Sequence, residues 1–168
     1  MSAVVSDSTR TPLNYLALLS DFDLLRQLYG SLIIPPAVHR EVVESGADYP
    51  VSNAVQAALG NWISVAQPPQ TSEVAALQQE HRLDLGESEA ILVAESLGKV
   101  LLLMDEQRGV RCARSRGLAV IRTPLIYADA KILGLIGSVR TKLDELRAGG
   151  FHLSDRHYEM ILREAGEL

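Results

Sequence analysis

The stretch Leu85–Glu106, LGESEAILVAESLGKVLLLMDE, contains a helical pattern followed by a buried strand. Apolar residues recur at helical spacing in its first half, and Gly98 marks the end of that helix. A continuous apolar run follows, as is typical of a strand buried in a parallel sheet, and Asp105 comes directly after it. Ligand sites in such sheets lie at the carboxyl ends of the strands, so an acid here indicates a metal or phosphate site.

The rest of the chain repeats this alternation of short apolar segments and helical patterns. We expect other strands at Ala3–Ser6, Ser31–Ile34 and Leu118–Ile121, and a minor extended piece at Trp62–Val65. Helices are expected at Pro12–Tyr29 with a break at Ser20–Asp21, and at Ala37–Val43, Val51–Leu59, Glu73–Glu80, Gln107–Arg116, Thr123–Leu135, Val139–Ala148 and after Ser154. This order predicts one α/β domain over residues 1–168 with a parallel sheet, in which residues 138–168 form a C-terminal helical extension packed on the rest.

The composition excludes several classes of protein. The chain has 168 residues, 47% of them hydrophobic, which suits a globular domain with a sizeable core. No apolar run approaches the ~18 residues of a membrane span, and no signal-peptide pattern opens the chain, so we expect a cytoplasmic protein without membrane contact. Cys112 is the only cysteine, which excludes a disulfide framework or a thiolate metal cluster. The net charge of −5 argues against a generally basic nucleic-acid binder but leaves room for a local basic patch.

Carboxylates from separate segments are expected at one edge of the sheet. Asp7 and Asp105 each follow a strand that we predict to be buried, so both should emerge at the carboxyl edge. Glu41 lies on the helix after the second strand, and Glu87 and Glu89 lie at the start of the helix before Asp105. Such oxygen ligands suit Mg²⁺ or Mn²⁺, and these cations can polarise a phosphodiester and activate a water.

Glu87 and Glu89 cannot both face this site, because two helical residues lie about 200° apart around the axis. Glu87 precedes Ala90, Ile91 and Ala94 by three, four and seven residues, so it extends their apolar stripe. We therefore predict that Glu87 points inward and that Glu89 lies nearly opposite, with Glu89 kept as the alternative ligand. Both also have an ordinary role, since acids in a first helical turn interact favourably with the helix dipole.

Arginines follow the acidic segment. They are the only charged residues between Gln107 and Ala128, and Arg108, Arg111 and Arg114 recur at intervals of three, which places them on one helix flank. A basic flank beside an acidic metal pocket suits a nuclease, because cations bind the phosphate backbone. The alternative is an ordinary solvated helix face.

The order and spacing of the acidic segments resemble the PIN-domain family of metal-dependent nucleases. The matching segments are VVSD (Val4–Asp7), IIPPAVHREVV (Ile33–Val43), LDLGESEAI (Leu83–Ile91) and VLLLMDE (Val100–Glu106). The segment Leu146–Glu167, LRAGGFHLSDRHYEMILREAGE, resembles the branch of predicted nucleic-acid-binding PIN proteins that is related to VapC-type toxins.

The resemblance implies a three-layer α/β/α fold with a parallel sheet of four or five strands. It implies a carboxylate quartet that binds Mg²⁺ or Mn²⁺, and an auxiliary role for the hydroxyls after the first acid. Residue by residue, the quartet falls on Asp7, Glu41, Glu87 and Asp105, and the auxiliary positions on Ser8 and Thr9.

The implied activity is a ribonuclease, the toxin of a type II toxin–antitoxin pair, with RNA as substrate, a cognate antitoxin and a homodimeric state. The alternative is a catalytically degenerate PIN-fold module that acts through a protein or nucleic-acid partner. Arg10–Thr11 favours this alternative, because it is inserted beside Asp7 where relatives continue directly to Pro-Leu.

Overall fold

The computed structural model describes residues 3–5, 12–45 and 49–168. Within them, the sheet has five strands, all parallel, in the order β3-β2-β1-β4-β5. The strands are β1 (Ala3–Val5), β2 (Leu32–Ile34), β3 (Ile63–Val65), β4 (Leu101–Leu103) and β5 (Ala119–Ile121). The predicted parallel α/β sheet is confirmed, and the minor extended piece proves to be the edge strand β3.

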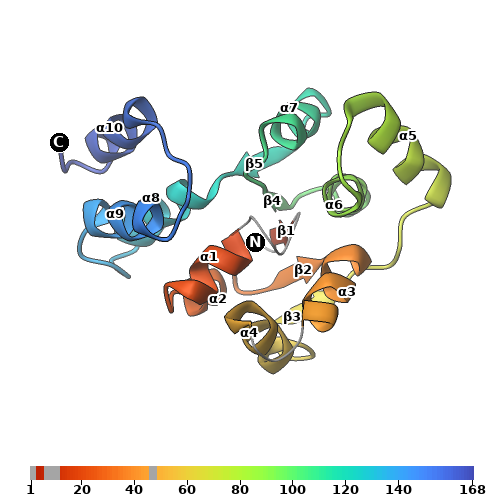
Figure 1. Ribbon diagram of the computed structural model, residues 1–168, viewed down its shortest axis with the longest axis horizontal. Helices are drawn as coiled ribbons and strands as arrows, with labels where there is room; N and C mark the ends of the chain where they lie inside the picture. The colour runs from red at the N-terminus through yellow and green to blue at the C-terminus, as the bar shows by residue number, and fades with distance from the viewer. Residues whose placement is uncertain (1–2, 6–11, 46–48) are drawn as a thin grey trace.

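Helices connect the strands and cover both faces of the sheet (Figure 1). They are α1 (Pro12–Leu18), α2 (Asp23–Tyr29), α3 (Pro36–Ser45), α4 (Pro50–Ala58), α5 (Thr71–His81), α6 (Leu85–Leu97), α7 (Gln107–Ser115), α8 (Thr123–Ile132), α9 (Val139–Ala148) and α10 (Asp155–Glu164). The expected break in the first long helical pattern separates α1 from α2, and Ser20 in that break has a φ of 61°. None of the helices within the described ranges is long and apolar enough to cross a membrane.

Two buried clusters, one on each face of the sheet, make the fold three-layered. Leu103 belongs to the cluster formed with α1, α2, α4 and α8 to α10, whereas Leu102 belongs to the cluster formed with α5, α6 and α7. Successive residues of a strand point to opposite faces, so one short apolar strand supplies both cores. The expected α/β/α arrangement is confirmed.

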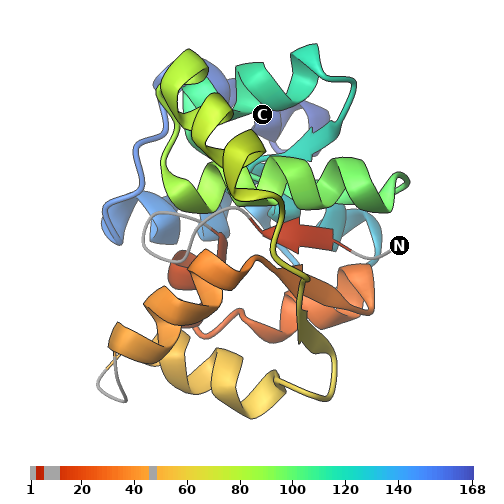
Figure 2. The same cartoon turned by 90° about the vertical axis from the view of Figure 1, so that its right-hand side faces the viewer.

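The strand register brings several chain segments to one level at the carboxyl edge. Val5 pairs with Leu103, and Leu103 pairs with Ile121, so β1, β4 and β5 end side by side. Helix α3 begins directly after β2, and α6 runs antiparallel to β1 before the chain enters β4 (Figure 2). The first turns of α3 and α6 therefore lie at the same edge as the ends of the central strands.

The C-terminal helices are anchored to the core by polar contacts as well as by apolar packing. Asp21, in the turn between α1 and α2, accepts a hydrogen bond from the Tyr127 hydroxyl at 2.9 Å and pairs with Lys142 Nζ at 3.0 Å. Leu143 of α9 and Leu162 of α10 are completely buried in the same cluster as the residues of α1. Helices α8 to α10 thus cover one end of the α1–α2 layer.

Candidate metal centre

Asp105 is fixed at the carboxyl edge by the start of α8. Its side chain is buried, and its carboxylate accepts hydrogen bonds from Thr123 N at 2.8 Å and from the Thr123 hydroxyl. The Asp105 carbonyl oxygen accepts a further bond from Arg122 Nη2 at 2.8 Å. The bonds from Thr123 therefore orient the Asp105 carboxylate at this edge of the sheet.

Glu87 is buried in the first turn of α6, where it forms a capping box with Asp84. Glu87 N donates to Asp84 Oδ1 at 2.7 Å, and Asp84 N donates to Glu87 Oε2 at 3.0 Å. One oxygen of Glu87, Oε2, therefore has the ordinary role of an acid at a helix start, because it accepts from the backbone N–H of the N-cap residue Asp84. The capping box also holds the side chain in one conformation, as a metal ligand requires.

The other oxygen of Glu87 lies under α7, beside Gly109. A methyl group on Gly109 would come within 3.0 Å of Glu87 Oε1 and 2.5 Å of Met104 Sδ. The missing side chain at this position lets α7 pass close over Glu87 and over Met104, which directly precedes Asp105. The structure thus brings the start of α6 and the exit of β4 together, as the sequence predicted.

Glu89 departs from the expectation of an outward-facing acid. It does lie on a different flank of α6 from Glu87, but that flank is covered by α3, and the side chain is buried. Its Oε2 accepts a hydrogen bond from Ala37 N, in the first turn of α3, at 2.7 Å. A helical wheel shows which residues share a flank but not which neighbouring helix covers it, so the burial of Glu89 could not be predicted from spacing.

Glu41 is half-buried on α3, one turn beyond Ala37. The helix that carries it packs against α6, the helix that carries Glu87 and Glu89. Asp7, Ser8 and Thr9 lie outside the described residues. The strand that precedes Asp7 ends at the level of the strand that precedes Asp105, because Val5 pairs with Leu103.

The described carboxylates fit a hard divalent cation. In residues 3–5, 12–45 and 49–168, no three His, Cys, Asp or Glu side chains are close enough to bind a metal by themselves. Glu87, Glu89 and Asp105 are nevertheless all buried, and the hydrogen bonds described above orient their carboxylates. Oxygen ligands of this kind match the preference of Mg²⁺ and Mn²⁺.

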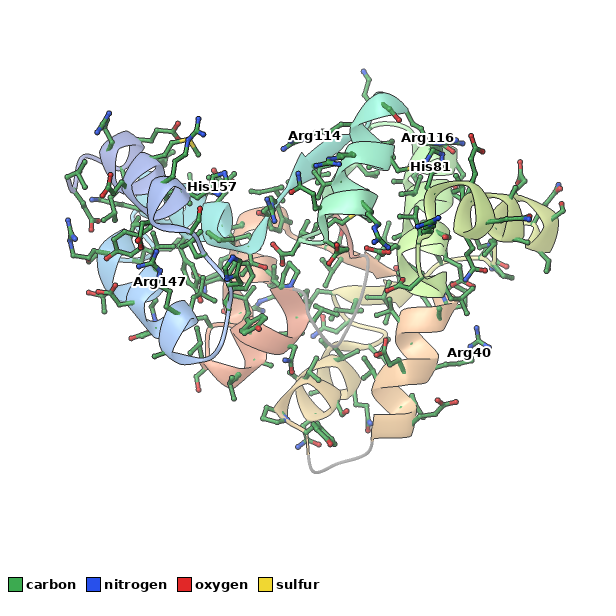
Figure 3. All side chains as sticks on the ribbon, turned by 45° about the horizontal axis from the view of Figure 1, so that its top comes forward. Arg40, His81, Arg114, Arg116, Arg147 and His157 are labelled. Atoms are coloured by element: carbon green, nitrogen blue, oxygen red, sulfur yellow. The ribbon has the colours of Figure 1, made fainter. Side chains whose placement is uncertain are left out.

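The arginine flank predicted on α7 exists. Arg108, Arg111 and Arg114 are exposed, and in the described part of the chain they form no ion pair. Arg116 differs, because its Nε and Nη2 donate to the two carboxylate oxygens of Glu95 on α6 at 2.6 and 2.9 Å, and this hydrogen bonding raises the pKa of Arg116. Figure 3 shows Arg114 and Arg116 at the end of α7.

Cys112, which lies among the arginines in sequence, is on the opposite, buried face of α7. Burial raises the pKa of its thiol, and the neighbouring Glu95, Glu80 and Glu87 add to the rise, while Arg116 opposes it. Cys112 is therefore part of the apolar core under α7.

Thr123, Arg122 and Gly109 were missed by the sequence reasoning. Thr123 orients the Asp105 carboxylate, Arg122 binds the Asp105 carbonyl, and Gly109 gives Glu87 its space. A signal was present for two of them: Thr123 and Pro124 open a helix shortly after a strand, and Gly109 interrupts the first turn of an otherwise amphipathic helix.

Residues 3–167 match a family model described as a PIN domain. The chain belongs to the PIN-domain family. PIN domains are commonly nucleases and typically use divalent metals, in accord with the donor set at the carboxyl edge of this PIN domain.

Two solved structures share the fold of this PIN domain. A PilT N-terminus domain protein, SSO1118 from Sulfolobus solfataricus P2, has a TM-score of 0.51 and 22% identity, covering 77% of this chain and 93% of that one. PAE2754 from Pyrobaculum aerophilum has a TM-score of 0.53 and 16% identity, covering 78% and 96%. At these identities the likeness shows the fold alone. A search of the curated proteins gives no match.

Proposed function

We propose that this PIN-domain protein is a metal-dependent ribonuclease that hydrolyses RNA phosphodiester bonds. Asp7, Glu41, Glu87 and Asp105 would bind Mg²⁺ or Mn²⁺ at the carboxyl edge of the sheet. The observation that supports this most strongly is the burial of Glu87 and Asp105 on two elements that meet beside Gly109, directly before an exposed row of arginines.

The chain's own residues would prepare the site in three ways. The capping box fixes Glu87, and Thr123 fixes Asp105, so these two carboxylates would be oriented before an ion binds. The arginines of α7, which begin three residues after Asp105, would hold backbone phosphates beside the scissile bond. The bound cation would supply polarisation of the phosphate and an activated water.

A toxin role within a type II toxin–antitoxin pair is part of this proposal. It is supported by the resemblance of Leu146–Glu167 to the branch of PIN proteins related to VapC-type toxins. A cognate antitoxin protein and a homodimer are the partners that such a role requires. Size-exclusion chromatography with light scattering, with and without the product of a neighbouring small open reading frame, tests both partners.

The direct test of the nuclease is cleavage of single-stranded RNA by the purified protein with Mn²⁺. The Asp7→Asn variant should keep the wild-type circular dichroism spectrum and lose the metal-dependent cleavage. Cleavage at the wild-type rate by this variant would remove Asp7 from the mechanism.

A catalytically degenerate binding module is the second candidate. It is favoured by the capping roles of Glu87 and Asp105, since hydrogen bonds to Asp84 and Thr123 would preserve these acids even in a protein without activity. Calorimetric titration with Mn²⁺ separates the two functions. A nuclease binds the ion with a carboxylate-dependent affinity, whereas a degenerate site gives no binding heat.

A further inference from the structure

The contact between Glu89 and the start of α3 joins two helices that are distant in sequence. Glu89 is 6% exposed, and its Oε2 lies 2.7 Å from Ala37 N, 52 residues away in the chain. No other side-chain acceptor for this N–H is supplied locally, since Pro35 and Pro36, which precede Ala37, have apolar side chains.

The N-terminus of α3 needs such an acceptor. The first N–H groups of a helix have no partner within the helix, and a side chain at the N-cap position usually accepts from one of them. Pro36 has no N–H, and His39 N already donates to the Pro35 carbonyl at 3.0 Å. Glu89 therefore acts as the N-cap of α3 from another helix, and the positive end of the α3 dipole favours its negative charge.

The hydrogen bond between Glu89 and Ala37 connects the two helices that carry the proposed metal ligands Glu41 and Glu87. Glu87 and Glu89 leave the first two turns of α6 on different flanks, Glu87 toward Gly109 and Met104 and Glu89 toward α3. Glu41 lies one turn beyond the capped residue of α3, about 6 Å along the helix axis. The position of Glu41 relative to Glu87 thus depends on how α3 begins against α6.

We propose that Glu89 is a positioning residue, which caps α3 and so holds Glu41 at the correct distance from Glu87, and that it is not itself a metal ligand. This inference rests on the proposed metal-dependent nuclease. It assigns the two acids of the GESE segment different tasks: Glu87 binds the ion, and Glu89 aligns the helix that carries another ligand.

Two substitutions separate positioning from ligation. Glu89→Gln keeps a side-chain oxygen of the same reach for Ala37 N but removes the charge that a cation needs, whereas Glu89→Ala removes both. The readout is the Kd for Mn²⁺, measured by calorimetry on the full chain below the melting temperature of each variant. RNA cleavage and thermal unfolding are followed in parallel.

We expect Glu89→Gln to bind Mn²⁺ with nearly the wild-type Kd, and Glu89→Ala to bind it about 10- to 100-fold more weakly, the range seen when a residue that orients a metal ligand is removed. Glu87→Gln serves as the ligand comparison and should weaken binding although it too keeps an oxygen. Glu95→Gln is the matched control on the same helix, since Glu95 pairs with Arg116 away from the site, and it should leave the Kd unchanged.

Three outcomes overturn the inference. Equal weakening by Glu89→Gln and Glu89→Ala would make Glu89 a ligand, and an unchanged Kd in Glu89→Ala would show that the cap does not position the site. In both of these cases the nuclease proposal survives, because the wild-type protein binds the ion. Absence of Mn²⁺ binding by the wild-type protein overturns the nuclease proposal and this inference together.

Discussion

Two groups of buried or largely buried carboxylates, one around the C-terminal helices and one at the carboxyl edge of the sheet, differ in the hydrogen-bond donors described for them. In the C-terminal helices, Glu167 accepts from Lys131 Nζ at 2.6 Å and from the first N–H groups of α9, and Asp21 pairs with Lys142. At the carboxyl edge of the sheet, the bonds described for Glu87, Glu89 and Asp105 come from backbone amides and a threonine hydroxyl.

We propose that this difference separates acids that stabilise the fold from acids that bind a metal ion. A carboxylate with a lysine beside it is neutralised when the chain folds, and it gains nothing from a metal ion. The bonds described at the sheet edge orient their carboxylates, and we propose that a cation from solution binds to them. On this basis we expect substitutions at the sheet edge to change metal binding, and substitutions in the C-terminal helices to change how stability depends on pH.

The largest effect is expected from Asp105→Asn. Loss of a ligand oxygen should weaken Mn²⁺ binding and slow RNA cleavage by at least about 100-fold. Substitution of a residue that only orients a metal ligand already costs up to about 100-fold in affinity or activity. Calorimetry and a cleavage assay measure both. Glu167→Gln is the matched control from the other group and should leave Mn²⁺ binding unchanged at pH 7; a comparable loss in this control would break the comparison.

The pH dependence of stability should come from Glu167. Burial raises its pKa, but hydrogen bonds from Lys131, Arg140, Val139 and Ser138 outweigh this and lower the pKa from 4.5 to about 2. A pKa below the unfolded value contributes stability above about pH 4.5, and this contribution is lost as the pH falls toward 2. Urea unfolding between pH 7 and pH 2.5 measures it.

The Glu167→Gln variant sharpens this prediction. It should be less stable than the wild-type protein at pH 7 and should lose less stability on acidification, because the titrating group is gone. Parallel pH profiles of the two proteins would contradict the assignment of the acid sensitivity to Glu167.

A smaller effect is expected at the crossing of α6 and α7. Gly109→Ala would place a methyl group 2.5 Å from Met104 Sδ and 3.0 Å from Glu87 Oε1. Overpacking of this kind costs about 1–3 kcal/mol, partly offset by the better helix propensity of alanine. Thermal unfolding and the Mn²⁺ Kd should both change. Gly137→Ala is the control, since a methyl group there meets nothing within 4 Å. If Gly109→Ala changes neither the melting temperature nor the Mn²⁺ Kd, the site tolerates a displacement of Met104 and Glu87.

The smallest effect is expected from the exposed arginines. Arg111→Ala should weaken RNA binding a few-fold and reduce the slope of log K against log salt by about 0.7, the value for one phosphate contact on a single strand. Arg116→Ala is the control on the same helix, because Arg116 is held by Glu95. Equal effects of the two variants on RNA binding would show that the flank is an ordinary solvated face.

Much of the fold could be predicted from local patterns. Val139–Ala148 has the expected bounds, and Ser154 caps the last helix by accepting from His157 N. The break near Ser20 was also anticipated, because the apolar spacing lapses there. These features depend on residues a few positions apart, where spacing, capping side chains and glycines act directly.

The site was predicted less completely, because its contacts join distant segments. The spacing of Glu87 to its apolar stripe placed it correctly toward the core, and the strand-end rule placed Asp105 at the carboxyl edge. The burial of Glu89 depends on α3, 52 residues earlier, and the orientation of Asp105 depends on Thr123, 18 residues later. No local pattern in either stretch carries that information.

For this PIN domain, the sequence by itself determined where most helices and strands begin and end, the parallel character of the sheet, and the inward direction of Glu87. Only the tertiary structure decided what each acid does there: Glu87 caps its own helix, Glu89 caps another, and Asp105 is held by the first residue of α8. The physical reason is that a hydrogen bond needs its donor within about 3 Å, and packing alone brings such donors together.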